Sequence, residues 1–191
     1  MRLCLLLCLS TPLFAQFPTV GERWGHYLYR TYSWQRMSLL GADSLVDHVL
    51  LDPAAFDRGP GGYWCRYSSG FGRRIVRNSI EFGAGFVLRE DLRYRRSPDR
   101  GILARLRMAT TSAVLAYDPA GGQHFAWSRL AANTGASMIS ASWQPYRNGT
   151  GRVAGNFAWS YVGQIENNLL SEFAPDILHL GKKVRTRFFR R

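Results

Sequence analysis

The clearest pattern along the chain is an apolar side chain at every fourth position near the C-terminal end. The residues at this spacing are Phe157, Tyr161, Ile165, Leu169 and Phe173. Because residues four apart share one face of an α-helix, the pattern predicts a helix over residues 153–173 with this stripe toward the core. The opposite face is expected to be solvated and carries Gln164, Asn167, Asn168 and Ser171. Pro175 is expected to end the helix, since proline has no backbone N–H.

A second helical pattern covers residues 69–90. Ile75, Phe82 and Phe86 fall on one side of this helix. Arg77 and Glu81 are four residues apart, so they are expected to pair on its surface.

Shorter patterns predict helices over residues 39–51, 102–117 and 128–143, and residues 20–33 form an aromatic-rich segment before them. The small residues of 128–143 indicate tight contacts between helices. Glycine and proline mark loops at 57–62 and 98–101. The chain is therefore expected to be all-α, a single compact helical domain of about five or six helices.

A second architecture also fits part of the sequence. Residues 141–143 and 153–162 can be interpreted as two strands of a hairpin with aromatic girdles, joined by the turn at 147–152. This arrangement is typical of a small outer-membrane β-barrel, which stays the alternative fold.

Residues 1–15 have the parts of a secretory signal peptide. Arg2 precedes an apolar run from Leu3 to Leu9, and small Ala15 stands where cleavage is expected. The run is far shorter than the roughly 20 apolar residues of a membrane-spanning helix. We therefore expect an exported protein, periplasmic or associated with the outer membrane, with a helical domain at 16–180 and a basic tail at 181–191. Only Cys65 follows the leader, which excludes an intramolecular disulfide in the mature chain.

The formal net charge is +12, and lysine occurs only at positions 182 and 183. Such a cationic surface attracts polyanions. For an exported chain these are an anionic membrane surface, lipopolysaccharide or an acidic polysaccharide, and no nucleic acid partner is expected. The tail supplies the candidate residues for binding an anionic surface: Lys182, Lys183, Arg185, Arg187, Arg190 and Arg191.

Residues with catalytic potential do not form a recognisable set. His26, His48, His124 and His179 have no metal-ligand spacing, and no nucleophile elbow or phosphate-binding loop occurs. We therefore predict no catalytic residue, no metal ligand and no cofactor. Glu172 is expected to bond an arginine such as Arg93 or Arg73.

Five short segments resemble an uncharacterised bacterial family of small exported helical proteins. They are residues 70–74, 90–94, 125–129, 140–145 and 171–177, which include a Gly-Phe-Gly-x-Arg motif and a closing Glu-Phe-x-Pro-Asp-Ile motif. This chain departs from the family pattern at Leu92, where a proline is expected, and at Trp143-Gln144. The resemblance implies an all-helical exported domain and assigns no activity.

Together these observations predict a non-enzymatic cell-envelope protein that associates with an anionic surface. The alternatives are the small outer-membrane barrel protein and a secreted hydrolase with an unrecognised site.

Overall fold

The computed structural model describes residues 17–144 and 149–188 of the chain. Its elements follow one another as α1 (Val20–Tyr32), α2 (Trp34–Leu50), α3 (Pro60–Val87), α4 (Ile102–Thr111), β1 (Leu115–Tyr117), β2 (Gln123–Phe125), α5 (Trp127–Ser140) and α6 (Gly149–Phe188). The two strands span three residues each. The prediction of an all-α domain is confirmed.

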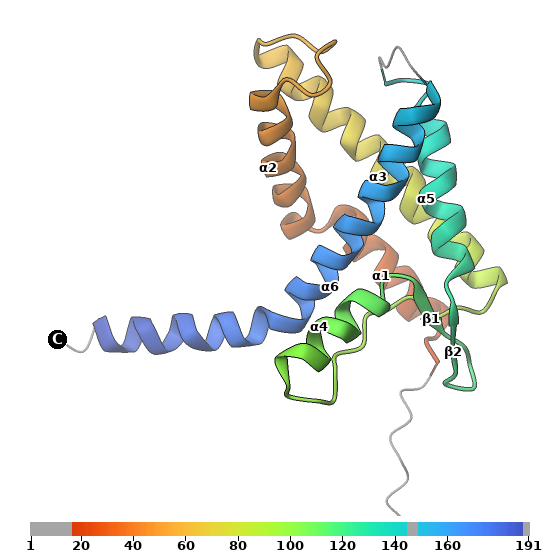
Figure 1. The fold of residues 1–191 in the computed structure, drawn as a ribbon, viewed down its shortest axis with the longest axis vertical. Coiled ribbons are helices and arrows are strands. Elements are labelled where there is room, and N and C mark those ends of the chain that lie inside the picture. Colours follow the sequence, from red (N-terminus) through yellow and green to blue (C-terminus); the bar gives the residue numbers. More distant parts are fainter. Residues whose placement is uncertain (1–16, 145–148, 189–191) are drawn as a thin grey trace, which may run out of the picture.

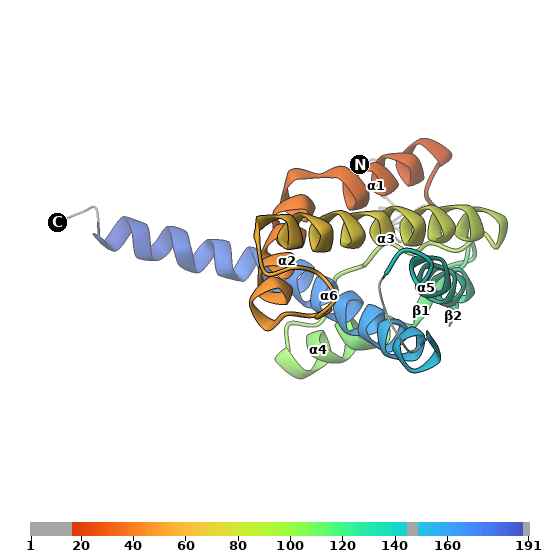
Figure 2. The ribbon, with the colours of Figure 1, turned by 90° about the horizontal axis from the view of Figure 1, so that it is seen from above.

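Helix α3 lies between two groups of helices (Figure 1). Helices α1 and α2 both pack against α3, and α5 makes the most extensive helix contact with it among the described residues. Figure 2 shows α1 and α5 on opposite sides of α3. Helix α6 packs against α5, and α4 packs against α6. The C-terminal part of α6 projects away from the other helices (Figure 1).

The start of α3 corrects the loop predicted over residues 57–62. Gly59 is the N-cap and Pro60 takes the first helical position, where its missing N–H needs no partner. The loop before α3 is held by Arg66, which is buried and donates to the carbonyl oxygens of Asp52, Pro53, Phe56, Asp57 and Gly62. The backbone approaches so closely that a Cβ at Gly62 would lie 1.7 Å from the Asp57 oxygen, so this position requires glycine.

The helix predicted over 102–117 is wrong in its second half. Helix α4 ends at Thr111, and β1 then pairs antiparallel with β2. In the turn, Gly121 has a φ of 87° and the Gly122 N–H donates to the Asp118 carboxylate at 2.7 Å. The sequence changes here from Leu, Arg and Met to Thr, Ser, Val and Tyr, residue types that favour extended backbone or turns over helix.

The contact between α3 and α5 is lined by small and polar residues. Helix α5 buries Ser128, Arg129, Ala132, Asn133, Ala136, Ser137 and Ser140. A Cβ at Gly135 would lie 2.8 Å from the Ile80 side chain, so the two helices approach closely there. The tight helix contact predicted from the small residues of 128–143 is confirmed.

Across the described residues the burial pattern is inverted relative to an ordinary globular protein. Fifteen polar or charged residues are buried, whereas the buried hydrophobic residues are Leu40 and six alanines. Twenty-seven large hydrophobic side chains are exposed, including all six tryptophans of the chain. Since a buried polar group costs free energy unless it is hydrogen-bonded, the fold depends on satisfying these groups.

Helix α6 shows this inversion most directly. Gln164 and Asn168 are 5% and 2% exposed, whereas Leu170 is 51% exposed. The Asn168 amide donates to the Ala109 carbonyl at 2.9 Å and accepts from the Gln164 amide at 3.1 Å. The prediction of a solvated polar face was therefore wrong for Gln164 and Asn168, because these amides bond to each other and to a buried carbonyl of α4. The predicted apolar stripe is half-buried.

Pro175 lies inside α6, which corrects the predicted end of this helix. A proline at this position removes the N–H that would donate to the carbonyl of Ser171. That carbonyl instead accepts from Arg96 Nε at 3.0 Å. The next carbonyl, of Glu172, accepts from Arg105 at 2.7 Å. Two arginines from outside the helix thus compensate the backbone around the proline.

The predicted leader, residues 1–15, lies outside the described residues. Residues 181–188 of the predicted tail continue α6, so the predicted boundary at residue 181 does not coincide with the end of an element. Arg190 and Arg191 lie outside the described residues.

We predict that α6 is more sensitive to loss of a polar side chain than of an apolar one. Asn168→Ala leaves the Ala109 carbonyl without its partner, which should lower the free energy of unfolding by roughly 1–3 kcal/mol. Leu170→Ala, on the outer side of the same helix, should change it by about 0.5 kcal/mol or less. Urea unfolding of both variants measures the difference, and the opposite order would contradict the inverted packing of α6.

Candidate functional site

Four helices meet at the buried carboxylate of Glu81 on α3. Arg30 of α1 lies 2.7 Å from Oε1, Arg129 of α5 lies 3.6 Å from the same oxygen, and Arg77 lies 3.9 Å from Oε2. Gln164 of α6 accepts hydrogen bonds from Arg30 and Arg77. Burial by itself would raise the pKa of Glu81, but the three arginines outweigh it and lower this pKa to about 2. The predicted pairing of Arg77 with Glu81 is confirmed, whereas its predicted surface position is wrong.

The arginines of this cluster also bind backbone and amide oxygens. Arg129 donates to the carbonyls of Ser112 and Ala113 between α4 and β1, and to that of Leu92. Burial lowers the pKa of Arg129, and the Glu81 carboxylate counteracts this effect. Arg77, whose pKa burial lowers to about 10, donates to Asn133 at 2.7 Å. The cluster contains three arginines and one carboxylate, so it holds more positive than negative charge.

A second buried carboxylate, Glu90, takes the place of an N-cap for α5. Ala126, the N-cap residue, has no side chain that could accept a hydrogen bond. Glu90 instead accepts from the backbone N–H groups of Trp127 and Ser128 at 3.0 and 3.1 Å, and from the Ser128 hydroxyl. A carboxylate at this end of a helix is also stabilised by the helix dipole.

A third carboxylate, Glu172, ties α6 to α4 and to the segment after α3. It accepts from the Tyr94 hydroxyl at 2.7 Å, from Arg105 at 2.8 Å and from the Ser97 N–H at 3.2 Å. Burial, followed by the hydrogen bond to Glu172, raises the pKa of Tyr94. The expectation that Glu172 bonds an arginine is confirmed with Arg105 of α4 as that arginine.

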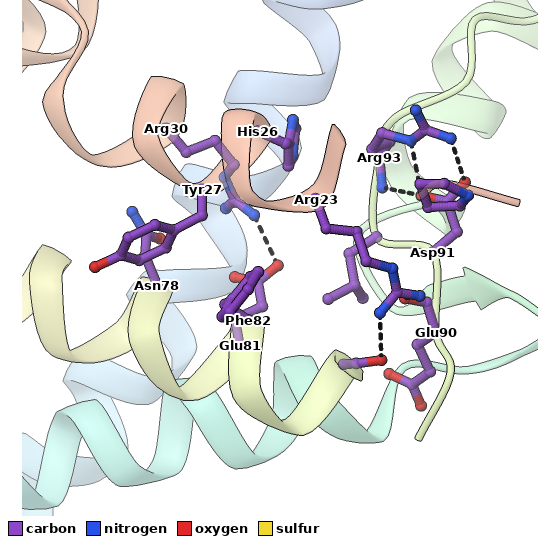
Figure 3. A pocket seen from close by; sticks show the side chains of 13 residues that line it. Arg23, His26, Tyr27, Arg30, Asn78, Glu81, Phe82, Glu90, Asp91 and Arg93 are labelled. Atoms are coloured by element: carbon purple, nitrogen blue, oxygen red, sulfur yellow. Dashed lines mark hydrogen bonds and ion pairs between the residues drawn. The ribbon is translucent and has the colours of Figure 1, made fainter. Parts of the chain in front are cut away.

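A small pocket of about 50 Å³ lies between α1, α3 and residues 90–93. Figure 3 shows Arg23 and Arg30 reaching from α1 to the Gly85 carbonyl and to Glu81. Burial, followed by the charge of Arg30, lowers the pKa of His26 in this pocket to about 4. His26 is therefore neutral at neutral pH.

A larger cleft of about 350 Å³ shares His26 and Arg30 with this pocket and extends toward α6. We call it the arginine cleft. Its polar lining includes Arg36 of α2 and Asn167 of α6. The two cavities therefore share part of their lining on α1.

Most of the candidate residues named from the sequence do not line either cavity. The six basic tail residues are not part of either cavity's described lining. Of the histidines, His26 lines both cavities, His124 lies 3.4 Å from Glu90, and His48 contacts Arg66. In residues 17–144 and 149–188 no three metal-ligating side chains are grouped to hold a metal ion.

Comparisons with known proteins give no assignment. No family model matches the sequence, and neither curated proteins nor solved structures give a significant match. The resemblance to a family of exported helical proteins stays a prediction. Within the described part of the chain, no helix has both the length and the apolar character needed to cross a membrane.

The sequence pattern does not predict that Arg30 and Arg129 join an interior cluster around Glu81. The burial of Arg129 could have been inferred from its position. It lies at the start of the small-residue pattern of α5, where a long side chain can enter the interior beside the alanines. Arg30 carries no comparable feature, because it follows the exposed positions Leu28 and Tyr29 in a helix rich in aromatic residues.

We predict that neutralising Glu81 destabilises the fold and removes part of its acid sensitivity. Glu81→Gln leaves buried Arg129 and half-buried Arg30 and Arg77 without their carboxylate, which should cost about 3–5 kcal/mol of unfolding free energy. Because the folded pKa of about 2 lies below the ordinary value of 4.5, the stabilisation is present above pH 4.5 and is lost as the pH falls toward 2. Denaturant unfolding between pH 7 and 2.5 measures both effects.

Glu166→Gln is the matched control, since Glu166 is an exposed carboxylate on α6. This variant should retain the stability and the acid dependence of the parent. Equal stability of the Glu81 and Glu166 variants at pH 7 would contradict the central role of the Glu81 cluster.

Proposed function

We propose that the protein is a non-enzymatic, exported cell-envelope protein that lies on an anionic membrane surface. The observation that carries this proposal is the exposure of all six tryptophans, from 39% at Trp143 to 77% at Trp34. Tryptophan combines a large apolar ring with a polar N–H and is enriched where proteins meet the membrane interface. A water-soluble monomer gains nothing from leaving so much apolar surface in water.

Part of this exposed apolar surface lies where α3 ends and α5 begins, and we call it the apolar patch. The patch consists of Phe86, Val87, Leu88, Phe125 and Trp127, which are between 39% and 79% exposed. The bonds from Trp127 and Ser128 to Glu90 hold the end of α3 beside the start of α5. Phe125 and Trp127 contact edge to face at 4.9 Å between ring centroids. The patch is therefore supported by the buried network beneath it.

Charge supports a lipid surface over an uncharged apolar partner. The chain carries a net charge of +12, and each cation near an anionic leaflet contributes about 1 kcal/mol to binding. Residues 181–188 of the basic tail belong to the projecting part of α6, which extends beyond the other helices (Figure 1). Insertion of the apolar patch into the membrane interface and attraction of the arginines and the tail to anionic lipids would both strengthen binding.

We predict that the mature protein sediments with vesicles containing anionic phospholipid and sediments poorly with neutral vesicles. Raising the salt concentration should weaken the binding, because ions screen exposed charges. The double variant Val87→Ser with Trp127→Ala should bind anionic vesicles more weakly by about tenfold or more, since two large apolar groups are removed from the interface. Deletion from Lys182 onward should also weaken binding.

The control is Val49→Ser with Trp159→Ala, which removes the same apolar groups from positions 72% and 70% exposed outside the patch. This control should lose less binding than the patch variant, because its two residues lie outside the patch. Equal binding of the parent to neutral and anionic vesicles at low salt would contradict the proposed function. Equal losses in the two double variants would show that the patch is not the contact.

A further inference from the structure

The arginine cleft differs from the rest of the described interior in the balance of its charges. Four arginines line it, namely Arg30, Arg36, Arg93 and Arg96. The other described residues of its lining are aromatic, aliphatic, amide, hydroxyl or imidazole groups, and none is an aspartate or glutamate. The buried clusters around it, by contrast, each contain a carboxylate.

Two of these arginines pair with carboxylates that do not line the cleft. Arg30 pairs with Glu81, and Arg93 pairs with Asp91. Arg36 and Arg96 form no ion pair with any carboxylate among residues 17–144 and 149–176. Arg36 donates to the Asn167 side chain, and Arg96 donates to the Ser171 carbonyl at 3.0 Å. Both guanidinium groups are thus oriented by α6 while their charges stay uncompensated.

The positive charges of this region oppose one another. Burial, followed by the charge of Arg30, lowers the pKa of Arg36. Burial, followed by the charge of Arg36, lowers the pKa of neighbouring Arg74, which donates to the Arg36 carbonyl. An anion bound in the cleft would offset this repulsion.

We propose that the arginine cleft binds a phosphate group, with Arg36 and Arg96 as its principal ligands. Guanidinium groups match phosphate oxygens with paired, charge-assisted hydrogen bonds. The Ser171 hydroxyl, the Asn167 amide and neutral His26 offer further polar groups around the same space. The cleft volume of about 350 Å³ falls within the range of small-ligand sites.

The phosphate can come from a soluble phosphate compound or from a lipid head group. The lipid source rests on the proposed function, whereas phosphate binding itself does not. A phosphomonoester, with two charges and three terminal oxygens, suits two unpaired arginines better than a phosphodiester does.

The test measures binding of inorganic phosphate to the full mature chain by isothermal titration calorimetry, with Arg36→Gln, Arg96→Gln and Arg107→Gln as variants. Arg107 is an exposed residue of α4 outside the cleft, so its variant loses the same charge without touching the site. Arg96 is also exposed and makes one exposed hydrogen bond to the Ser171 carbonyl, so its replacement should disturb the fold less than Arg36→Gln does. Unfolding midpoints in phosphate-free buffer identify any folding defect.

We expect the parent and Arg107→Gln to bind phosphate equally and the two cleft variants to bind about tenfold more weakly or worse, as loss of a charged ligand does. No binding by the parent, or equal affinity in Arg96→Gln and Arg107→Gln, overturns the proposed site. A second arm compares vesicles containing a phosphomonoester lipid with phosphodiester vesicles of equal surface charge.

A preference for phosphomonoester vesicles that Arg96→Gln abolishes supports the lipid source. Phosphate binding without any vesicle binding supports the soluble source and contradicts the proposed function. Vesicle binding without phosphate binding leaves the proposed function standing and overturns this inference.

Discussion

The carboxylate of Glu81 is the constraint on which the rest of the structure depends. An ionised group can stay in a protein interior only if opposite charges and hydrogen-bond donors surround it. Here the opposite charges come from helices distant in sequence: Arg30 on α1 donates a hydrogen bond to the carboxylate, and Arg129 on α5 forms an ion pair with it. Gln164 of α6 joins the same cluster through its bonds to Arg30 and Arg77. Satisfying one carboxylate therefore fixes how α1, α3, α5 and α6 lie relative to one another.

This polar interior leaves the large apolar side chains on the outside. Alanine, serine and asparagine fill the space between α3 and α5, and tryptophan, leucine and valine side chains cover the outer faces. The hydrophobic free energy that usually stabilises a core is then available for contact with an apolar partner. The proposed membrane association depends on the exposed apolar groups. The proposed phosphate site depends on the excess of arginines over carboxylates.

The helical class and the approximate positions of most helices could be predicted from the sequence. The reason is that the periodicity of a helix shows in the sequence as a regular spacing of apolar residues. Which face of each helix is buried could not be predicted in this way. The stripe from Phe157 to Phe173 indicates a helix correctly, but the choice of buried face followed the usual preference for apolar interiors. That preference fails for α6, where Gln164 and Asn168 have partners on other elements. The helix beyond Pro175 was also unpredictable, since the arginines that compensate the proline come from residues 96 and 105.

The inverted orientation of α6 can be measured directly by thiol labelling of single cysteines in a chain whose native cysteines are replaced by serine. A cysteine at Leu170, which is 51% exposed, should react rapidly under native conditions, and one at Asn168, which is 2% exposed, should react only on unfolding. Fast labelling at Asn168 with protection at Leu170, in folded variants, would show that α6 buries its apolar face and would contradict the polar interior.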